Sequence, residues 1–577
     1  MIIKYYFYNI IKYVLIAQFF YITIASANEY NRSNPEPSSS IKQHKKTTSK
    51  KYMIVTADFR ASQAANKILS LGGNALDAAI AAQNVLSVVE PQSSGLGGGG
   101  FLIYYDKKSQ KIFAYDGRET ASSNAKKNMF LNVNKEKMNF LKAVSNPISI
   151  GVPGLYSMLA DAHIEHGIVK WEKLFAEAIV YAESFKVSDR LNKLLLWAPH
   201  IKQNTFVNET YYVKGAPKNV GSFITNPQLK ESLQILSKNP YSLNKGELAS
   251  LISAKLNKKI TLKDLNNWKT IKRSAICKLL KNYKVCGFPP PTSGGVGVLQ
   301  ILGIINFKSD FVQRKNKAYH YHLFLEASRL AYLDRDHYIA DPYFFKTPTS
   351  ILISDKYLYK RSNLINDYMS DSSFTKGNFS SLYNKIQKGK NYKKESTTHI
   401  SIVDSFGNAV ALTTSIEFAF GSGITVGGFF LNNQLTDFSF ISEDNNNNLI
   451  ANSVAPGKKP RSSMAPTLIF ENNNLIGVLG SPGGSRIICY VAKALFEIIY
   501  LETDPYDAVN KTHLCSRNEY SEIEDTKENF ELIKNLKEFN HKIKVKKMTS
   551  GLNIIWKKNN KWYGIADKRR EGNAIGH

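Results

Sequence analysis

Cysteine is scarce in this chain, which has four cysteines in 577 residues and no C-x-x-C pair. No histidine accompanies them at metal-ligand spacing, so we expect neither a zinc site nor any other metal or cofactor. Cys277 and Cys286 flank the polar turn Lys281-Asn282 and could face each other across a hairpin. An export-compartment disulfide and two unpaired thiols both stay open as alternatives at this point.

Long apolar runs are also rare. The run from Tyr13 to Ile24 follows Lys4 and Lys12 and ends at the small residues Ala25-Ser26-Ala27. This is the pattern of a signal peptide over residues 1–27, cleaved after Ala27, and the alternative is an uncleaved membrane anchor. Since no later stretch could span a bilayer, we expect no stable membrane span after signal removal. The protein is predicted to be exported, either to the periplasm or as a secreted protein.

Acidic residues are outnumbered, 47 Asp and Glu against 76 Lys and Arg, which gives a net charge of +29. Such a charge raises the question of nucleic-acid binding. The lysines are instead scattered through Asn/Lys-rich loops such as Lys385 to Lys394. We therefore expect no nucleic-acid partner, and attribute the charge to anionic envelope surfaces or to a lysine-rich composition.

The N-terminal third predicts two tandem helices and a hairpin. Helical periodicity runs from Asp58 to Glu90 and breaks at Gly72-Gly73, where Asn74 can cap a second helix. A glycine-dense loop, Ser94 to Gly100, then leads into an expected hairpin. This loop satisfies G-x-G-x-x-G, but it runs from helix into strand, so a dinucleotide site is rejected.

A second predicted hairpin surrounds Thr397. The runs His399 to Val403 and Ala409 to Ile416 are strand-like and flank a turn centred on Phe406. Folding about Phe406 places Ser415 opposite Thr397, because each lies nine residues from that centre. Before this hairpin, residues 370 to 396 are polar and could be opened at low cost. With mostly helices on either side of central strands, the pattern predicts an α/β fold with a layered sheet core.

The sequence Thr397-Thr398-His399-Ile400-Ser401 is typical of the start of an enzyme. If the bond before Thr397 is cut, a hydroxyl nucleophile and a free amine lie on the same residue. An α-amine titrates near neutrality, so it can remove the proton from its own hydroxyl. Because that amine fills the role of base, we expect His399 to be structural.

With these residues the chain resembles the γ-glutamyltranspeptidase family of the N-terminal-nucleophile hydrolase superfamily, from about residue 52 to 505. Several long motifs carry the resemblance. They are residues 72–79, Glu90-Pro91 with the glycine loop, 151–154, 289–295, 397–404, 431–438, 461–464 and 480–486.

The resemblance implies a four-layer αββα sandwich and a precursor that cuts itself between Ser396 and Thr397. After a flexible polar tail at residues 28–50, a large subunit (51–396) and a small catalytic subunit (397–577) would stay together as a heterodimer. The implied activity is γ-glutamyl transfer and hydrolysis through an acyl group on Thr397. Glutathione and other γ-glutamyl compounds would be donors, and water, amino acids or dipeptides acceptors, in glutathione catabolism and cysteine scavenging.

The resemblance also implies the roles of individual residues. Arg118 would clamp the donor's α-carboxylate as a planar fork, with hydroxyl donors from Ser462 and Ser463. The donor's α-ammonium would be bound by Asp437, Gln434 and Glu417. Backbone N–H groups of Gly483 and Gly484 would form the oxyanion hole, and Ser415 would hydrogen-bond the Thr397 hydroxyl.

The chain departs from the family pattern in three places. Ser415 and Glu417 stand where many relatives carry Thr and Asn. The loop Glu443 to Asn448 is shorter than the lid of some bacterial relatives and lacks its aromatic residue, so the pocket is expected to be more open to acceptors. Residues 506–550 do not follow the family pattern, which puts the last strands of the small subunit in doubt.

Two alternatives accompany this interpretation. A related acylase of glutaryl amides would also use Arg118, but a glutaryl group has no α-ammonium for Asp437, Gln434 and Glu417. A catalytically inactive relative that serves as a binding protein is the other alternative, and the presence of Thr397 argues against it.

Overall fold

Two seven-stranded antiparallel sheets form the centre of the computed structural model, which describes residues 46–308, 316–379, 383, 385–389 and 396–577. The sheet that carries Thr397 has the strand order β23 (Asn573–Gly576), β2 (Met53–Thr56), β12 (Ser396–Val403), β13 (Ala409–Glu417), β3 (Gly99–Asp106), β4 (Lys111–Asp116) and β9 (Ile271–Arg273). The second sheet has the order β1 (Thr47–Ser49), β22 (Lys561–Ala566), β21 (Asn553–Lys558), β17 (Asn474–Gly480), β16 (Thr467–Glu471), β11 (Tyr283–Gly287) and β10 (Ile276–Leu280).

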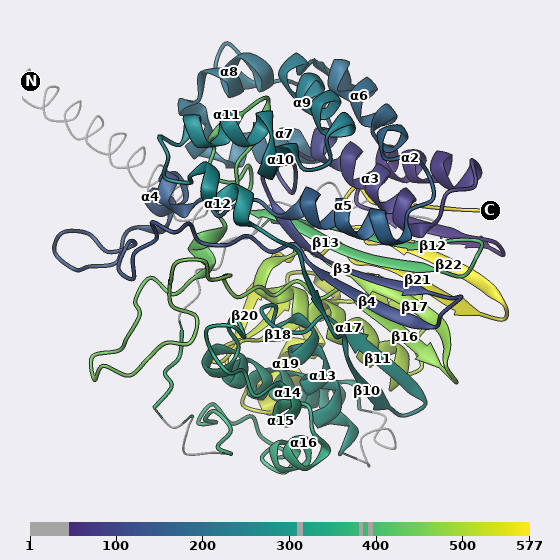
Figure 1. Cartoon of the computed structure of the whole chain (residues 1–577). Coiled ribbons are helices and arrows are strands. Elements are labelled where there is room, and N and C mark those ends of the chain that lie inside the picture. The colour runs from purple at the N-terminus through teal and green to yellow at the C-terminus, as the bar shows by residue number, and fades with distance from the viewer. Residues whose placement is uncertain (1–45, 309–315, 380–382, 384, 390–395) are drawn as a thin grey trace, which may run out of the picture.

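Helices cover the outer face of each sheet, so the layers run helix, sheet, sheet, helix (Figure 1). The layer over the Thr397 sheet contains α2 (Phe59–Ser70), α3 (Ala75–Val89), α5 (Leu155–His166), α6 (Ala176–Glu183), α7 (Asp189–Trp197), α8 (Thr205–Tyr211), α9 (Pro227–Lys238), α10 (Ser242–Lys245), α11 (Glu247–Lys255) and α12 (Leu262–Asn267), with α4 (Phe140–Val144) at its side. The other layer contains α13 (Gly294–Asn306), α14 (Lys317–Tyr338), α15 (Thr349–Leu352), α16 (Asp355–Ser362), α17 (Ile487–Ile499) and α18 (Pro505–Asn510). The expected four-layer α/β sandwich is confirmed.

The alternation of side chains along β12 explains why its sheet has two buried faces. Ile400 and Ile402 pack into the hydrophobic cluster that includes α3, whereas Val403 belongs to the cluster that includes both sheets and α17. Residues of one parity therefore point to the helices and those of the other parity point between the sheets. Thr397 has the parity of Val403, so its side chain faces the gap between the sheets.

Local signals in the sequence account for the helices behind Thr397. Asn74 caps α3, since its side chain accepts the N–H groups of Leu76 and Asp77, and the Asp77 carboxylate accepts the Asn74 N–H in return. Every residue of α3 is buried. The two tandem helices and the hairpin of β3 and β4 are confirmed at nearly the predicted positions.

The N-terminal prediction needs one correction. Thr47–Ser49 lie inside the stretch that composition assigns to a polar tail, yet they form strand β1 and pair with β22. Tertiary pairing here overrides a polar local sequence. The predicted signal peptide and residues 28–45 lie outside the described residues.

Two disulfides join the four cysteines. Cys277 and Cys286 are directly paired residues of β10 and β11, so the open alternative is decided in favour of the disulfide. Cys489 of α17 bonds Cys515 of β18 (Leu514–Ser516), which the sequence did not indicate.

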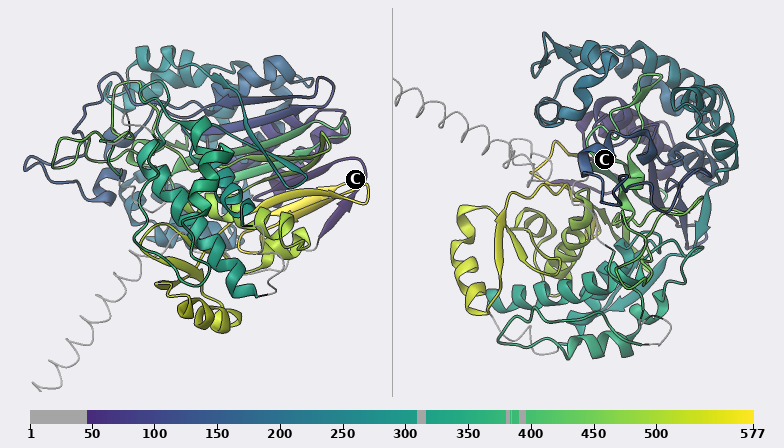
Figure 2. Two further views of the ribbon diagram at one scale, coloured as in Figure 1. Left: turned by 90° about the horizontal axis from the view of Figure 1, so that it is seen from below. Right: turned by 90° about the vertical axis from the view of Figure 1, so that its left-hand side faces the viewer.

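The divergent segment forms a small unit at one edge of the molecule (Figure 2). Its three-stranded sheet contains β18, β19 (Ser521–Glu524) and β20 (Ile543–Lys546), accompanied by α19 (Phe530–Glu538). The strands that follow it, β21 to β23, take regular places in the two large sheets. The doubt about the last strands is thereby removed.

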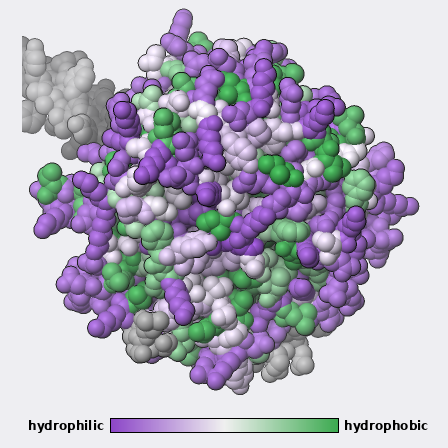
Figure 3. All heavy atoms as spheres, viewed as in Figure 1, coloured by the Kyte–Doolittle hydropathy of each residue, from purple (hydrophilic) through white to green (hydrophobic). Residues whose placement is uncertain are grey.

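Short strand pairs complete the fold: β5 (Phe185–Lys186) with β8 (Phe223–Ile224), β6 (Tyr212–Val213) with β7 (Ala216–Pro217), and β14 (Thr425–Val426) with β15 (Phe429–Phe430). On the face shown in Figure 3, hydrophilic side chains predominate and hydrophobic ones form small separate patches. Among the described residues, no helix combines the length and apolar character needed to cross a bilayer.

Buried histidines predict a loss of stability in acid. His541 is the clearest case: its Nε2 lies 2.9 Å from Nδ1 of His322, and its Nδ1 lies 3.1 Å from the Ser521 hydroxyl. Burial lowers the pKa of His541 to about 2, and the neighbouring His322 and Arg329 act in the same direction, while the carboxylate of Glu326 lies 3.9 Å away. Burial likewise lowers the pKa of His513 to about 4 and that of His399 to about 3.

Because the folded-state pKa lies below that of the unfolded chain, these groups contribute fully above about pH 6.5, and their contribution is lost as the pH falls. Each should lower the free energy of unfolding by about 1.4 kcal/mol per pH unit below that point. Urea unfolding of the uncut Thr397→Ala chain between pH 7 and 4.5 measures the slope. In His541→Gln this slope should be smaller by about 1.4 kcal/mol per pH unit, which is the contribution of one proton. In His577→Gln, which changes an exposed residue, the slope should stay the same. An unchanged slope in His541→Gln would contradict the assignment.

Candidate active site

The hairpin of β12 and β13 places Ser415 beside Thr397. The observed register pairs Thr398 with Thr414 and Val403 with Ala409, which confirms the predicted centre of the hairpin. The register shifts between Ser396 and Thr398, where Ser396 pairs with Glu417. This β-bulge turns the end of the hairpin, and bulges of this kind re-aim side chains at functional sites.

The Ser415 hydroxyl is the centre of a small hydrogen-bond network. It donates to the carbonyl oxygen of Ser396 at 2.5 Å and accepts the N–H of Glu417 at 2.9 Å. The Thr397 hydroxyl donates to the Ser415 Oγ atom at 3.4 Å. Ser415 therefore contacts both the Thr397 hydroxyl and the carbonyl of the peptide bond that precedes it.

Charged residues behind β12 fix the Thr397 backbone. The buried Arg570 donates from Nη1 to the Thr397 carbonyl oxygen at 3.0 Å, and the Thr398 hydroxyl donates to Glu90 at 3.2 Å. Burial raises the pKa of Glu90 to about 7, although Arg190, 3.5 Å away, acts in the opposite direction. These contacts leave Thr397 little freedom to move.

His399 is held as a structural residue, as expected. Its ring nitrogens lie 2.8 Å from the Thr413 hydroxyl and 3.0 Å from the Ser401 hydroxyl. The ring packs on Gly480 of the facing sheet, where an added Cβ would lie 2.3 Å from it. Glycine at 480 therefore permits the close approach of the two sheets beside Thr397.

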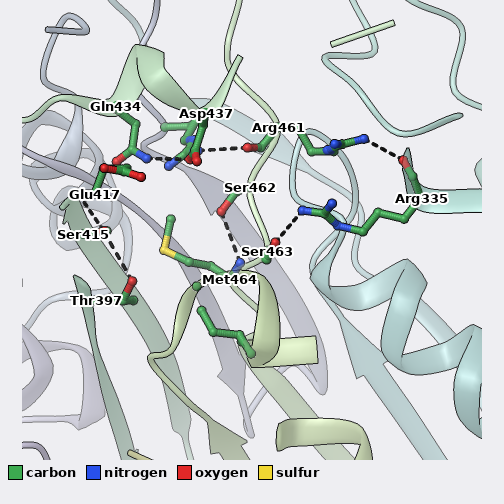
Figure 4. A pocket seen from close by; sticks show the side chains of 13 residues that line it. Arg335, Thr397, Ser415, Glu417, Gln434, Asp437, Arg461, Ser462, Ser463 and Met464 are labelled. Atoms are coloured by element: carbon green, nitrogen blue, oxygen red, sulfur yellow. Dashed lines mark hydrogen bonds and ion pairs between the residues drawn. The ribbon is translucent and has the colours of Figure 1, made fainter. Parts of the chain in front are cut away.

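A pocket with about 320 Å³ of space, including its open mouth, lies above Thr397 and collects the predicted site residues from both halves of the chain (Figure 4). Its lining includes the predicted residues Arg118, Thr397, Ser415, Glu417, Gln434, Asp437, Ser462, Ser463 and Gly484. Gly483 is the predicted residue that does not line it.

Arg118, which follows β4, forms the positive end of the pocket. Its Nη2 donates to Asp437 Oδ2 at 2.5 Å and to the carbonyl oxygen of Arg461 at 3.1 Å, and its Nε donates to the Pro460 carbonyl oxygen at 3.1 Å. Burial raises the pKa of the neighbouring Glu119 to about 7, while Arg118 acts to lower it. The guanidinium is thus fixed in place with its charge shared mainly with Asp437.

Two serine hydroxyls lie beside this end of the pocket. Ser463 Oγ accepts from Arg335 Nη2 at 2.7 Å, and Ser462 Oγ accepts the Met464 N–H at 3.1 Å. In the described contacts neither hydroxyl donates a hydrogen bond, so each proton is available to a ligand. Two oriented O–H donors next to a guanidinium suit a carboxylate.

The acceptors of the pocket lie next to Arg118, since Asp437 is its ion-pair partner. Gln434 and Asp437 lie on a 3-10 turn (Gln434–Asp437), and the Gln434 amide donates to Asp437 Oδ2 at 2.7 Å. The amide oxygen of Gln434 is buried and has no hydrogen-bond partner among the described residues. Glu417 accepts from Asn433 Nδ2 at 2.5 Å and has a φ of 77°. An unpaired acceptor between two carboxylates suits an ammonium group.

The glycine pair lies where the facing sheet leads into α17. Gly483 has a φ of +126°, and a Cβ there would lie 2.5 Å from the Tyr490 ring. Gly484 has a φ of +59° and begins the 3-10 turn Gly484–Arg486 that enters α17. Both positions need the backbone freedom of glycine, and the helix that follows favours negative charge near this loop.

The sequence missed three residues that shape the pocket. Arg335 and Arg461 line it, and Asn433 orients Glu417. Arg461 donates to the Arg335 carbonyl oxygen at 2.7 Å, and burial, followed by the charge of Arg335, lowers its pKa to about 9. Nothing local distinguished Arg335 from the other charged residues near the end of its helix, whereas Arg461 and Asn433 lay in motifs that the sequence did single out.

Two further features concern the loop at residues 443–448 and possible metal ligands. None of residues 443–448 belongs to the pocket lining, so in the described part of the chain the short loop does not close over it. No cluster of three or more potential metal ligands occurs among the described residues.

The chain is similar to known proteins in both sequence and structure. The sequence model of the family described as Gamma-glutamyltranspeptidase matches residues 61–577. The chain is 30% identical to the glutathione hydrolase proenzyme of Bacillus subtilis strain 168, over 96% of either chain. It is 33% identical to that of Escherichia coli K12, over 80% of either chain. A cephalosporin acylase structure from Bacillus halodurans aligns with a TM-score of 0.78 over 94% of this chain and 99% of that one, but at 23% identity this likeness shows the fold alone.

The Ser415 contacts generate a prediction about cleavage before Thr397. Ser415→Ala removes the donor to the Ser396 carbonyl, so self-cleavage should slow by about 100-fold, as when one oxyanion donor is lost. Ser415→Thr keeps the hydroxyl and should cleave within a few-fold of wild type. The time course of fragment formation on a denaturing gel measures both. Ser422→Ala, which removes a buried hydroxyl bonded to Leu431, is the control; cleavage of Ser415→Ala at the wild-type rate would contradict the prediction.

Proposed function

The chain belongs to the γ-glutamyltranspeptidase family, and we propose that the pocket around Thr397 is the place where this enzyme transfers and hydrolyses γ-glutamyl groups. One observation carries the assignment. The pocket offers donors for a carboxylate and, next to them, two carboxylates and the unpaired amide oxygen of Gln434 for an ammonium, with Thr397 in the same lining. A γ-glutamyl donor such as glutathione presents both charged groups on one carbon and a reactive carbonyl farther along.

The first reaction is the cleavage between Ser396 and Thr397. As the Thr397 oxygen attacks the Ser396 carbonyl carbon, its proton passes to Ser415, and Ser415 gives its own proton to the carbonyl oxygen. The contacts of 3.4 Å and 2.5 Å provide this route. The C–N bond then breaks as the nitrogen takes the proton of the newly formed hydroxyl and the carbonyl re-forms, which frees the Thr397 α-amine and leaves an ester on the Thr397 oxygen. Water hydrolyses this ester, which frees the Thr397 hydroxyl and leaves a carboxylate on Ser396.

The second reaction uses the same hydroxyl on a donor. Arg118, Ser462 and Ser463 bind the α-carboxylate, and Gln434, Asp437 and Glu417 bind the α-ammonium. The Thr397 amine takes the hydroxyl proton as the oxygen attacks the γ-carbonyl, and the N–H groups of Gly483 and Gly484 stabilise the oxyanion. The amine of cysteinyl-glycine leaves with a proton. Water or an acceptor amine then takes the γ-glutamyl group from Thr397.

The glutaryl-acylase alternative is disfavoured by the ammonium end of the pocket. A glutaryl group could use Arg118 and the serines, but it has no group to donate to the buried amide oxygen of Gln434. A buried acceptor left unpaired costs about 1 to 3 kcal/mol. The pocket therefore fits γ-glutamyl donors better.

We propose in addition that the enzyme acts outside the cytoplasm and as two associated fragments. Two disulfides support export into an oxidising compartment, in agreement with the predicted signal peptide. Fragments 28–396 and 397–577 would remain a heterodimer that degrades external glutathione and supplies cysteine.

Self-cleavage predicts two fragments for the wild type and one for Thr397→Ala. A denaturing gel of the purified proteins measures this, and N-terminal sequencing of the smaller fragment should begin at Thr397. Thr398→Ala removes the neighbouring hydroxyl, which binds Glu90, and should still give two fragments. A single band for a wild type that releases glutamate from glutathione would contradict self-cleavage.

The two ends of the pocket can be separated with two inhibitors, glutamate and glutarate, which differ in the α-ammonium. Arg118→Ala should weaken inhibition by both, by about 100-fold or more, because both present a carboxylate. Gln434→Met removes the unpaired acceptor and should weaken inhibition by glutamate alone, by about tenfold. Inhibition constants against glutathione hydrolysis measure the effects. Equal losses for the two inhibitors in Gln434→Met would remove Gln434 from the ammonium site.

A further inference from the structure

A second cavity, distinct from the pocket above Thr397, lies between the N-terminus of α2, the strand pair of β5 and β8, and residues 570–573. It holds about 1350 Å³ of space including its open mouth, which is several times the space of the first pocket. Neither the reaction at Thr397 nor the family's γ-glutamyl donor uses it. Its interior, about 620 Å³, accommodates a small organic molecule.

Aromatic rings form much of its wall. Phe59 and Phe223 both line it, and their side chains are 50% and 58% exposed. Phe185, also in the lining, is buried beneath. Large aromatic side chains left open to solvent at a concave place are characteristic of ligand sites.

The charges around these rings have a positive excess. Of the five charged residues in the lining, Asp58 and Glu571 are acidic and Arg60, Lys186 and Arg570 are basic. Asp58 is fully engaged by Arg60, with Nε to Oδ1 at 2.8 Å and Nη2 to Oδ2 at 2.6 Å. Glu571 accepts the backbone N–H of Arg190 at 3.0 Å.

Among the described residues, Lys186 has no such ion pair. No carboxylate lies within 4 Å of its Nζ in the described part of the chain, and its Cα is paired with that of Phe223 across β5 and β8. The Nζ atom lies 5.6 Å from the centre of the Phe223 ring. An exposed ring face beside an ammonium without a counter-ion matches a flat apolar group that carries a negative charge.

Arg570 connects the cavity with Thr397. Arg570 lines the cavity, and the same guanidinium donates to the Thr397 carbonyl oxygen at 3.0 Å and to the Thr549 carbonyl oxygen at 3.5 Å. A molecule in the cavity would touch the side chain that fixes the backbone of Thr397.

We propose that this cavity is a second ligand site that takes an aromatic carboxylate, with its ring against Phe223 and Phe59 and its carboxylate on Lys186, and that its occupant alters turnover at Thr397 through Arg570. The binding does not depend on the proposed function of the first pocket. The effect on turnover does, because Thr397 is the residue on which it acts.

Calorimetry with 2-naphthoate as the probe tests the binding in the purified wild-type protein. The probe should bind saturably, with or without saturating glutamate in the Thr397 pocket, and 2-naphthylmethylammonium should not bind. Lys186→Glu and Phe223→Ser should each weaken binding by about fivefold or more. Both side chains are exposed, so folding is not at risk. Lys214→Glu and Phe530→Ser, at exposed residues elsewhere, should bind as wild type does.

Three outcomes of this experiment would overturn the site. They are the absence of saturable binding, equal binding of the cationic probe, and displacement of naphthoate by glutamate, which would assign the probe to the Thr397 pocket. The rate of glutathione hydrolysis with the cavity saturated tests the second part. If naphthoate changes the kcat of the wild type but not that of Lys186→Glu, the result supports the link through Arg570. Saturable binding with an unchanged kcat overturns that link and leaves the proposed function intact.

Discussion

The hydrogen bond from the Ser415 hydroxyl to the Ser396 carbonyl oxygen is the constraint on which the site depends. A serine hydroxyl has one proton to donate, and in the uncut chain it is committed to this carbonyl at 2.5 Å. If the bond before Thr397 is cut as proposed, that carbonyl would become part of a free carboxylate, and the Ser415 proton could turn to Thr397 or to an arriving donor. A single hydroxyl would thus serve two successive reactions, because the hairpin register brings Ser415 beside Thr397.

The charged groups of a γ-glutamyl donor would meet side chains that are already fixed. Arg118 is bound by two backbone carbonyls, and Arg461 by the carbonyl oxygen of Arg335, so these guanidiniums give up little freedom when an anion arrives. Burying charges is costly unless they are paired and hydrogen-bonded. Asp437 meets that condition by pairing with Arg118. When a glutamyl group binds, Arg118 would turn in part to its α-carboxylate and Asp437 in part to its α-ammonium. Binding then replaces one set of ion pairs with another instead of creating new ones.

Much of this arrangement follows from local sequence, and some of it does not. The side-by-side placement of Thr397 and Ser415 was predictable because a turn centre and the two-residue period of strands fix the parity of a hairpin. The capping box of Asn74 was equally local. The contact of Arg118 with Asp437 joins residues 319 positions apart, and only resemblance to a family could place both at one site.

Neither the local sequence nor the family resemblance predicted the role of Arg335 or the strand β1. Arg335 reaches Ser463 from a helix of the other layer, and its role depends on how that helix is oriented, which no spacing records. Thr47–Ser49 are polar and became a strand only because β22 offers an open edge.

The fold explains why the two predicted fragments would not separate after cleavage. In the Thr397 sheet, strands from residues after 396 flank β2, and β3 pairs with β13; in the other sheet, strands before 396 occupy both edges. Separating the fragments would break strand pairs in both sheets and expose the core between them, so cleavage can free the Thr397 amine without releasing either half.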